Sequence, residues 1–162
     1  MDLAEQLLVG AAASLLPAEG ELVVPGLRSR VEVRRDRWGA HYLRADSLDD
    51  LWFAQGFVAG SERCFQIDLA LRAANGRLSE LFGPSTLDDD RFVRTVGLHR
   101  AGRRYVEVWS DASRTIVQRF VDGVLAWVAA TPTPPVEYSL LDTKPDLPND
   151  LASWASCWAY LA

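Results

Sequence analysis

Few side chains in this 162-residue chain are of the types that carry out catalysis or bind metals. There are two histidines, His41 and His99, and two cysteines, Cys64 and Cys157. Neither histidine has a serine or cysteine next to it in the sequence that could act as an activated nucleophile, and the cysteines fit no zinc-binding spacing. We therefore predict that the histidines are structural and that the cysteines behave as small buried apolar side chains.

Longer catalytic motifs are also missing from the sequence. It contains no glycine-rich dinucleotide loop, no phosphate-binding P-loop, no His-Glu-x-x-His zinc motif and no Gly-x-Ser-x-Gly nucleophile turn. We therefore expect no catalytic residue and no metal ligand in this chain. By itself, the chain does not carry a complete active site.

The composition is that of a folded globular protein, with 49% hydrophobic and 24% charged residues. A formal net charge of -5 disfavours nucleic acid as a partner, because phosphate binding needs a basic face. No apolar run reaches the roughly 18 residues of a membrane-spanning helix. The apolar start carries Asp2 and Glu5 where a signal peptide would be basic, which favours an amphipathic helix over residues 2–16.

The elements that follow are predicted from periodicity and capping residues. Alternating apolar and charged residues over 31–35 indicate a strand with Val31 and Val33 pointing inward, joined by a four-residue loop to a second strand over 40–45. Ser47 is a helix N-cap that opens a long helix ending near Gly76. Further helices are expected over 91–96, capped by Asp88 or Asp89, over 98–109, and from Ser110 or Asp111 to 130.

The last segment, residues 151–162, is almost uncharged and follows a rigid proline-rich connector over 131–135. Its apolar residues are not confined to one side, which predicts a helix that is buried all round. We expect either that another chain covers this helix or that the polypeptide stops inside a larger domain.

An ordered set of segments resembles a known family. The segments are VEVRRDRWG at 31–39, DLWFAQGFV at 50–58, ERCFQID at 62–68, GRLSELFG at 76–83 and DRFVR at 90–94. In this order and spacing, residues 25–162 resemble the α subunit of the penicillin acylase (penicillin amidase) family. These are N-terminal nucleophile hydrolases that cleave linear amides such as β-lactam side chains and acyl-homoserine lactones.

The resemblance implies a fold and a partner. The fold would be mostly α with a small β-hairpin, the α-subunit part of an αββα sandwich. Residues 1–24 would form an N-terminal helix and connector, and residues 25–162 an α-subunit domain truncated at its C-terminus. A β subunit from the same precursor would carry the N-terminal Ser nucleophile, so this chain alone would be inactive. The resemblance allows a calcium ion at the subunit junction and points to the periplasm or secretion, whereas the missing signal peptide leaves the cytoplasm open.

The resemblance also suggests roles for individual residues. The segment 151–162 corresponds to the helix that lines the acyl pocket, which makes Trp154, Trp158, Ala159 and Ala162 candidate substrate-binding residues for an apolar acyl group. Core packing or a subunit interface would explain both tryptophans equally well. The family's His-Ala-Gln-Asp-Arg is replaced here by AGSER at 59–63. A buried ion-pair network is expected around Arg63, with the acids Glu62, Asp68 and Glu80.

A function of another class remains open at this point. A noncatalytic helical module could use the apolar last helix to bind a partner. A Ser-led β segment encoded downstream would favour the acylase, and its absence would favour the module.

Overall fold

The computed structural model describes residues 2–17 and 19–161. Helix α1 (Leu3–Ala13) begins at Asp2, whose side chain accepts a hydrogen bond from the Glu5 amide while the Glu5 side chain accepts one from the Asp2 amide. This reciprocal capping satisfies two backbone donors at the helix start. The helix expected near the N-terminus is confirmed, with a shorter range than 2–16.

Strands β1 (Glu32–Arg35) and β2 (His41–Arg44) form an antiparallel hairpin in which Arg35 faces His41. The Asp36 carboxylate closes the loop by accepting hydrogen bonds from the amides of Trp38 and Ala40, at 2.8 and 2.9 Å. The expectation that Val33 points inward is wrong, because this side chain is 46% exposed. Only β2 alternates half-buried with exposed residues, and β1 is exposed along its whole length.

Helix α2 (Leu48–Ala74) starts at Ser47, whose hydroxyl accepts a hydrogen bond from the Asp50 amide, as predicted. It bends sharply at Arg63, where the backbone is non-helical (φ -141°, ψ 24°). Gly60 and Ser61 precede the bend, and the Ser61 hydroxyl donates to the Val58 carbonyl at 2.7 Å. Glycine–serine pairs and hydroxyls that bond back to the helix are common causes of kinks. The two halves of α2 therefore face different neighbours.

The chain then turns through α3 (Ser79–Phe82), a 3-10 turn (Gly83–Thr86), α4 (Leu87–Val96) and α5 (Leu98–Glu107). The expected cap of α4 by Asp88 or Asp89 is wrong, since the N-cap is Thr86 and both acids lie inside the first turn. There they face the positive end of the helix dipole.

Helix α6 (Asp111–Ala130) is capped by Ser110 and packs along the first half of α2. The two helices approach closely because glycines lie at the crossing. A Cβ atom on Gly56 would overlap the backbone carbonyl of Phe120, and one on Gly123 would overlap that of Phe53. Buried side chains form two clusters beside this contact: Leu71, Ala74, Val121, Val124, Trp154 and Cys157 in one, and Phe57, Cys64, Trp127 and Tyr138 in the other.

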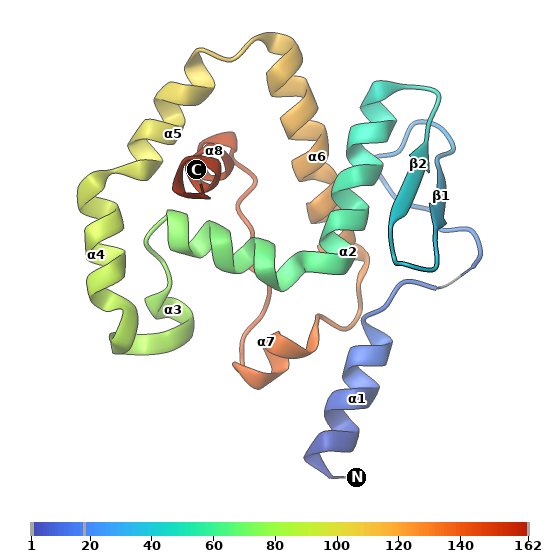
Figure 1. Cartoon of the computed structure of the whole chain (residues 1–162), viewed down its shortest axis with the longest axis horizontal. Coiled ribbons are helices and arrows are strands. Elements are labelled where there is room, and N and C mark those ends of the chain that lie inside the picture. Colours follow the sequence, from blue (N-terminus) through green and yellow to red (C-terminus); the bar gives the residue numbers. More distant parts are fainter. Residues whose placement is uncertain (1, 18, 162) are drawn as a thin grey trace.

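Helices α7 (Val136–Leu140) and α8 (Leu151–Leu161) complete the fold. In Figure 1, α8 is seen end-on inside a ring formed by α2, α4, α5 and α6. Its contacts are with α2, α5 and α6. Residues 153–157 are buried, whereas 158–161 are exposed, so the expectation of burial all round is wrong for the last turn. The helix leaves the ring at that point.

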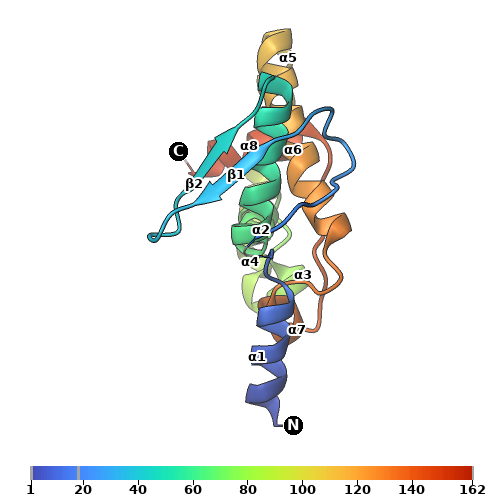
Figure 2. The same ribbon diagram turned by 90° about the vertical axis from the view of Figure 1, so that its right-hand side faces the viewer.

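The fold class is mostly α with a small β-hairpin, as predicted. Figure 2 shows that the ring is thin and that the hairpin and the C-terminal end of α8 project from the same face. None of the helices in residues 2–17 and 19–161 is long and apolar enough to cross a membrane.

Candidate functional site

The two tryptophans of α8 have different environments. Trp154 is 4% exposed, its indole Nε1 donates to the Pro148 carbonyl at 2.8 Å, and its ring meets Phe120 edge-to-face at 6.1 Å. Trp158 is 45% exposed and its ring lies 5.8 Å from that of Trp109. In this chain, then, Trp154 is a core residue, and Trp158 is open to a ligand or partner.

The exposed part of α8 continues into neighbouring aromatic rings. Tyr105 of α5 is 65% exposed and packs edge-to-face on Trp109, which in turn contacts Trp158. We call Tyr105, Trp109 and Trp158 the α5–α8 aromatic surface. Trp109 follows the end of α5 at Glu107, four residues after Tyr105. Sequence reasoning did not group these two rings with Trp158. Such a surface suits an apolar ligand or a second polypeptide.

The other predicted pocket residues lie nearby or outside the described chain. Ala159 is exposed in the last turn of α8, next to Trp158. Ala162 falls outside the described residues. Trp158 and Ala159 thus lie together at the exposed end of α8, whereas Trp154 is buried and does not share their surface.

The hairpin presents a second exposed aromatic group on the same face. Trp38 is 79% exposed with the Arg37 guanidinium 4.7 Å above its ring, and Tyr42 is 62% exposed. Two strands alone form a weak sheet, and both edges of this one lack a strand partner among the described residues. The hairpin is therefore suited to pairing with another polypeptide.

A buried ion-pair network lies behind α8, but it is not centred on the predicted arginine. Arg63 is exposed at the bend of α2, so its predicted burial is wrong. Arg72 takes that place: its Nε lies 2.8 Å from Asp68, and its Nη1 lies 2.7 Å from Glu80. Glu80 also pairs with Arg77, which reaches Asp146 in the connector before α8.

Glu62, the remaining predicted member, belongs to a different contact. Its carboxylate lies 3.6 Å from Arg35 and 3.8 Å from His41 Nε2, so it holds the hairpin against α2. The bend at Arg63 separates Glu62 from Asp68 by pointing the two halves of α2 in different directions. Of the four predicted residues, Asp68 and Glu80 thus belong to the Arg72 network, Glu62 belongs to the hairpin contact, and Arg63 belongs to neither.

Asp68 is the most connected acid in this network. Besides Arg72, it accepts hydrogen bonds from the Tyr138 hydroxyl at 3.0 Å and from the Asp146 amide at 3.3 Å. The Tyr138 hydroxyl also lies 3.6 Å from the Cys64 sulfur. Burial raises the pKa of the Cys64 thiol to about 11 and also raises the pKa of Tyr138. Both groups stay protonated at neutral pH, so Cys64 is not an activated nucleophile.

Among the described residues, the exposed aromatic side chains could bind a ligand or partner, but no nucleophile lies beside a base that would activate it. Both cysteines are buried, as predicted. Within residues 2–17 and 19–161, no group of three or more histidine, cysteine or acidic side chains could hold a metal ion. The exposed aromatic rings of α5, α8 and the hairpin suit recognition of an apolar group or of another chain.

Comparisons with known proteins agree with the resemblance read from the sequence. The penicillin acylase 2 proenzyme of Pseudomonas sp. (strain SE83) is 36% identical over 134 residues, which cover 83% of this chain and 17% of that protein. The acyl-homoserine lactone acylase QuiP of Pseudomonas aeruginosa is 33% identical over 122 residues, covering 68% of this chain and 14% of that protein. The chain thus spans less than a fifth of the length of these relatives.

The fold is also similar to that of a solved structure. A thermostable penicillin G acylase from Alcaligenes faecalis matches with a TM-score of 0.70 and 27% identity, covering 80% of this chain and 70% of that chain. The model of the penicillin amidase family matches residues 30–162. With the family pattern extending over the hairpin and all helices after it, this chain belongs to the penicillin amidase family.

Proposed function

We propose that this chain is the α-subunit part of a linear-amide hydrolase of the penicillin acylase type. In this proposal it lines the acyl pocket for a β subunit from the same precursor, which carries the N-terminal Ser nucleophile. The observation that supports the proposal is the exposed α5–α8 aromatic surface. It lies on a chain of the penicillin amidase family whose described residues include no activated nucleophile.

The open end of α8 supplies the substrate contacts in the proposal. An apolar acyl group binds best between apolar and aromatic walls. Trp158 and Ala159 are exposed there, and Ala162 follows them in the sequence. Trp154 supports this wall from behind through its contact with Phe120. Substrates named for the relatives, penicillins and acyl-homoserine lactones, define the compounds to be assayed.

The exposed edges of the hairpin would be the second contact with the β subunit. β1 is exposed throughout, and Trp38 and Tyr42 offer aromatic area beside it. An added strand would satisfy the open backbone groups of the sheet edge. The nucleophile, its amino-group base and the oxyanion donors would all come from the β subunit.

A calcium ion at the subunit junction is the one cofactor that the family resemblance raises. The described residues do not fit a calcium cage by themselves, since no three acidic side chains among them converge. No step of the proposed reaction is assigned to such an ion.

The test is co-expression of this chain with its downstream coding region. Mass spectrometry should find two fragments with a new N-terminal Ser, and the complex should hydrolyse penicillin G or an acyl-homoserine lactone, whereas the purified chain alone should not. Trp158→Ala should change KM with acyl-chain length while leaving cleavage of the precursor intact. Phe92→Ala on α4 removes a ring that is 69% exposed, and as the control it should leave acyl-length preference unchanged.

Two results would contradict this function. Turnover by the purified chain that is lost on mutation of one of its own residues would show that it has a nucleophile of its own. An uncleaved, inactive product that still binds a partner protein through α8 would support the noncatalytic helical module instead.

A further inference from the structure

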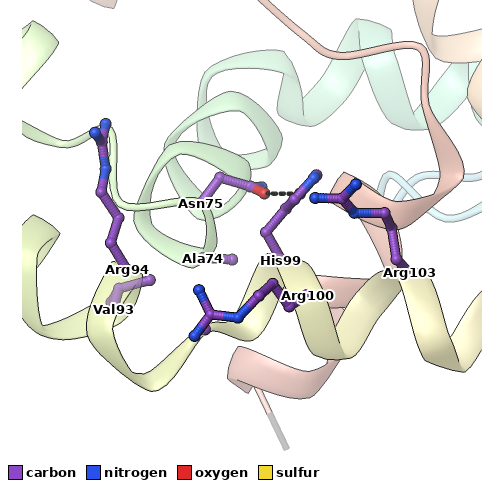
Figure 3. A pocket seen from close by; sticks show the side chains of 8 residues that line it. Ala74, Asn75, Val93, Arg94, His99, Arg100 and Arg103 are labelled. Carbon is purple, nitrogen blue, oxygen red and sulfur yellow. Dashed lines mark hydrogen bonds between the residues drawn. The ribbon is translucent and has the colours of Figure 1, made fainter.

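A cavity of about 280 Å³ opens where the end of α2 meets the corner between α4 and α5. Its apolar lining consists of Ala74 and Val93, both of which are buried. Its polar lining includes His99 and three arginines, Arg94, Arg100 and Arg103. In Figure 3, the Arg103 guanidinium lies beside the His99 ring, Arg100 extends from α5 in the other direction towards α4, and Arg94 lies on α4.

The charge of this lining is not balanced within the chain. Among the described residues, no ion pair joins Arg94, Arg100 or Arg103 to a carboxylate, although the chain as a whole has a net charge of -5. The guanidinium partners that are present are backbone carbonyls, Gly76 for Arg94 at 2.8 Å and Thr95 for Arg100 at 3.5 Å. Three like charges around one cavity repel one another, and a bound anion would relieve that repulsion.

The acid one turn before Arg94 is already engaged elsewhere. Asp90 is buried, and its two carboxylate oxygens accept hydrogen bonds from the amides of Leu78 and Ser79, at 2.7 and 2.8 Å. The Ser79 hydroxyl donates to the second oxygen as well. Asp90 therefore stabilises the turn before α3, and it offsets part of the Arg94 charge without forming an ion pair with it.

His99 is oriented by a fixed neighbour. Its Nδ1 lies 3.1 Å from Asn75 Oδ1, while Asn75 Nδ2 donates to the carbonyls of Leu71 and Ser153. Those two donations set the orientation of the amide, so Oδ1 is the acceptor and Nδ1 carries the shared proton. When Nδ1 carries the proton, Nε2 of the neutral ring is a hydrogen-bond acceptor, so His99 forms part of the wall and does not pair with an anion.

The start of α5 adds further positive character to the same wall. Its N-cap is Gly97, a left-handed residue (φ 82°) that offers no side-chain cap. A Cβ atom there would collide with the Arg100 guanidinium, so the glycine allows Arg100 to fold back over the helix start. Helix N-termini attract anions through free amides and the helix dipole.

We propose that this cavity binds a small organic carboxylate. The carboxylate group pairs with the Arg103 guanidinium, while Arg94 and Arg100 add positive charge around the opening. A short apolar body lies on Ala74 and Val93. Guanidinium groups bind carboxylates through paired hydrogen bonds, which favours this anion over a halide. The volume lies at the lower limit of ligand pockets, so the body has only a few carbons.

The test uses the full chain labelled with ¹⁵N and titrated with butyrate. We expect saturable shifts of the His99 imidazole and arginine side-chain signals, and a rise in Tm. Butyramide, a neutral molecule of similar shape, should produce neither effect. Inorganic phosphate should bind more weakly than butyrate, because it cannot use the apolar lining.

Two variants separate a site from general surface charge. Arg103→Gln should weaken butyrate binding by roughly tenfold or more, the effect of losing a charge-assisted hydrogen bond. Arg104→Gln removes the same charge from the next residue of α5, which does not line the cavity, and should bind as the unmodified chain does. Equal losses in both variants, non-saturable shifts, or equal binding of butyramide would overturn the proposal. Circular dichroism of each variant verifies that it is folded.

Discussion

The Arg72 guanidinium lies 2.8 Å from the Asp68 carboxylate, one turn earlier on α2, and both side chains are almost completely buried. The same carboxylate accepts the Tyr138 hydroxyl of α7 and the Asp146 amide of the connector to α8. Asp68 therefore joins α2 to two contacts that lie 70 and 78 residues later in the sequence. Through this contact the second half of α2 determines where the connector runs and where α8 begins.

Asp68→Asn should strongly destabilise the fold. The variant leaves a buried Arg72 with only the half-exposed Glu80 as a charged partner. Breaking one partner of a buried pair typically costs about 3–5 kcal/mol in the free energy of unfolding. Urea unfolding followed by circular dichroism measures this loss.

The control for that prediction is Asp88→Asn. Asp88 pairs with Arg91 at 3.2 Å across an exposed turn of α4, where water screens the charges. Its removal should lower the unfolding midpoint only slightly, because an exposed acid in the first turn of a helix contributes at most about 1 kcal/mol. Equal, small effects of the two variants would contradict the structural role of Asp68.

The sequence predicted the long helices well because their caps and spacing are local signals. Ser47 and Ser110 each accept a hydrogen bond from an amide three residues later, as the capping pattern required. Sequence reasoning chose Arg63 rather than Arg72 as the buried arginine, because the bend in α2 determines which residues face the core. Gly60 and Ser61 were the local sign of that bend.

In the candidate site, too, the local features could be predicted from the sequence, whereas those that depend on packing could not. The apolar character of residues 151–162 is visible in the sequence, whereas the depth to which α8 enters the ring depends on packing against α5. Gly102 allows that approach, since a Cβ atom there would overlap the Ala152 carbonyl. The different exposures of Trp154 and Trp158 follow from this contact, which no spacing within α8 reveals.

Gly56→Ala should destabilise the contact between α2 and α6. The added methyl group would overlap the Phe120 carbonyl, and backbone cannot move aside as a flexible side chain can. Overpacking of this kind costs about 1–3 kcal/mol or more, which exceeds the gain in helix propensity. Thermal unfolding measures the change.

Gly10→Ala on α1 is the matched control for the glycine prediction. No other atom lies within 4 Å of a Cβ atom built there. Alanine should therefore be neutral or slightly stabilising at that position, as expected for a helix interior. A drop in Tm as large as that of Gly56→Ala would argue against steric overlap as the cause.

The buried thiol of Cys64 predicts a loss of stability at alkaline pH. Burial raises its pKa from 9.0 to about 11, so the folded state holds this proton more tightly than the unfolded state. Unfolding then releases a proton above the unfolded pKa, and the free energy of unfolding falls as pH rises from about 9 to 11.

Cys64→Ser isolates this contribution, because the serine hydroxyl does not titrate in that range. The difference in stability between the original chain and the variant should be constant below pH 9 and should shift in favour of the variant above it. Cys157 is common to both proteins and cancels in the difference. A difference that stays constant up to pH 11 would refute a raised pKa at Cys64.

The last prediction compares the two tryptophans of α8. Trp154→Ala removes a buried ring that contacts Phe120 and should cost about 3–5 kcal/mol of stability. Trp158→Ala removes a ring that is 45% exposed and should cost much less. Urea unfolding of the two variants measures this contrast.

The same pair tests what the open end of α8 does. Exposed apolar area drives association at roughly 25 cal/mol for each Å² removed from water. We therefore expect the isolated chain to self-associate through the α5–α8 aromatic surface, and Trp158→Ala to shift it towards monomer in analytical ultracentrifugation. Phe92→Ala, which removes a 69% exposed ring from α4, is the control and should change self-association less. If all three chains are monomeric at high concentration, the exposed aromatic surface does not drive association and does not require a partner.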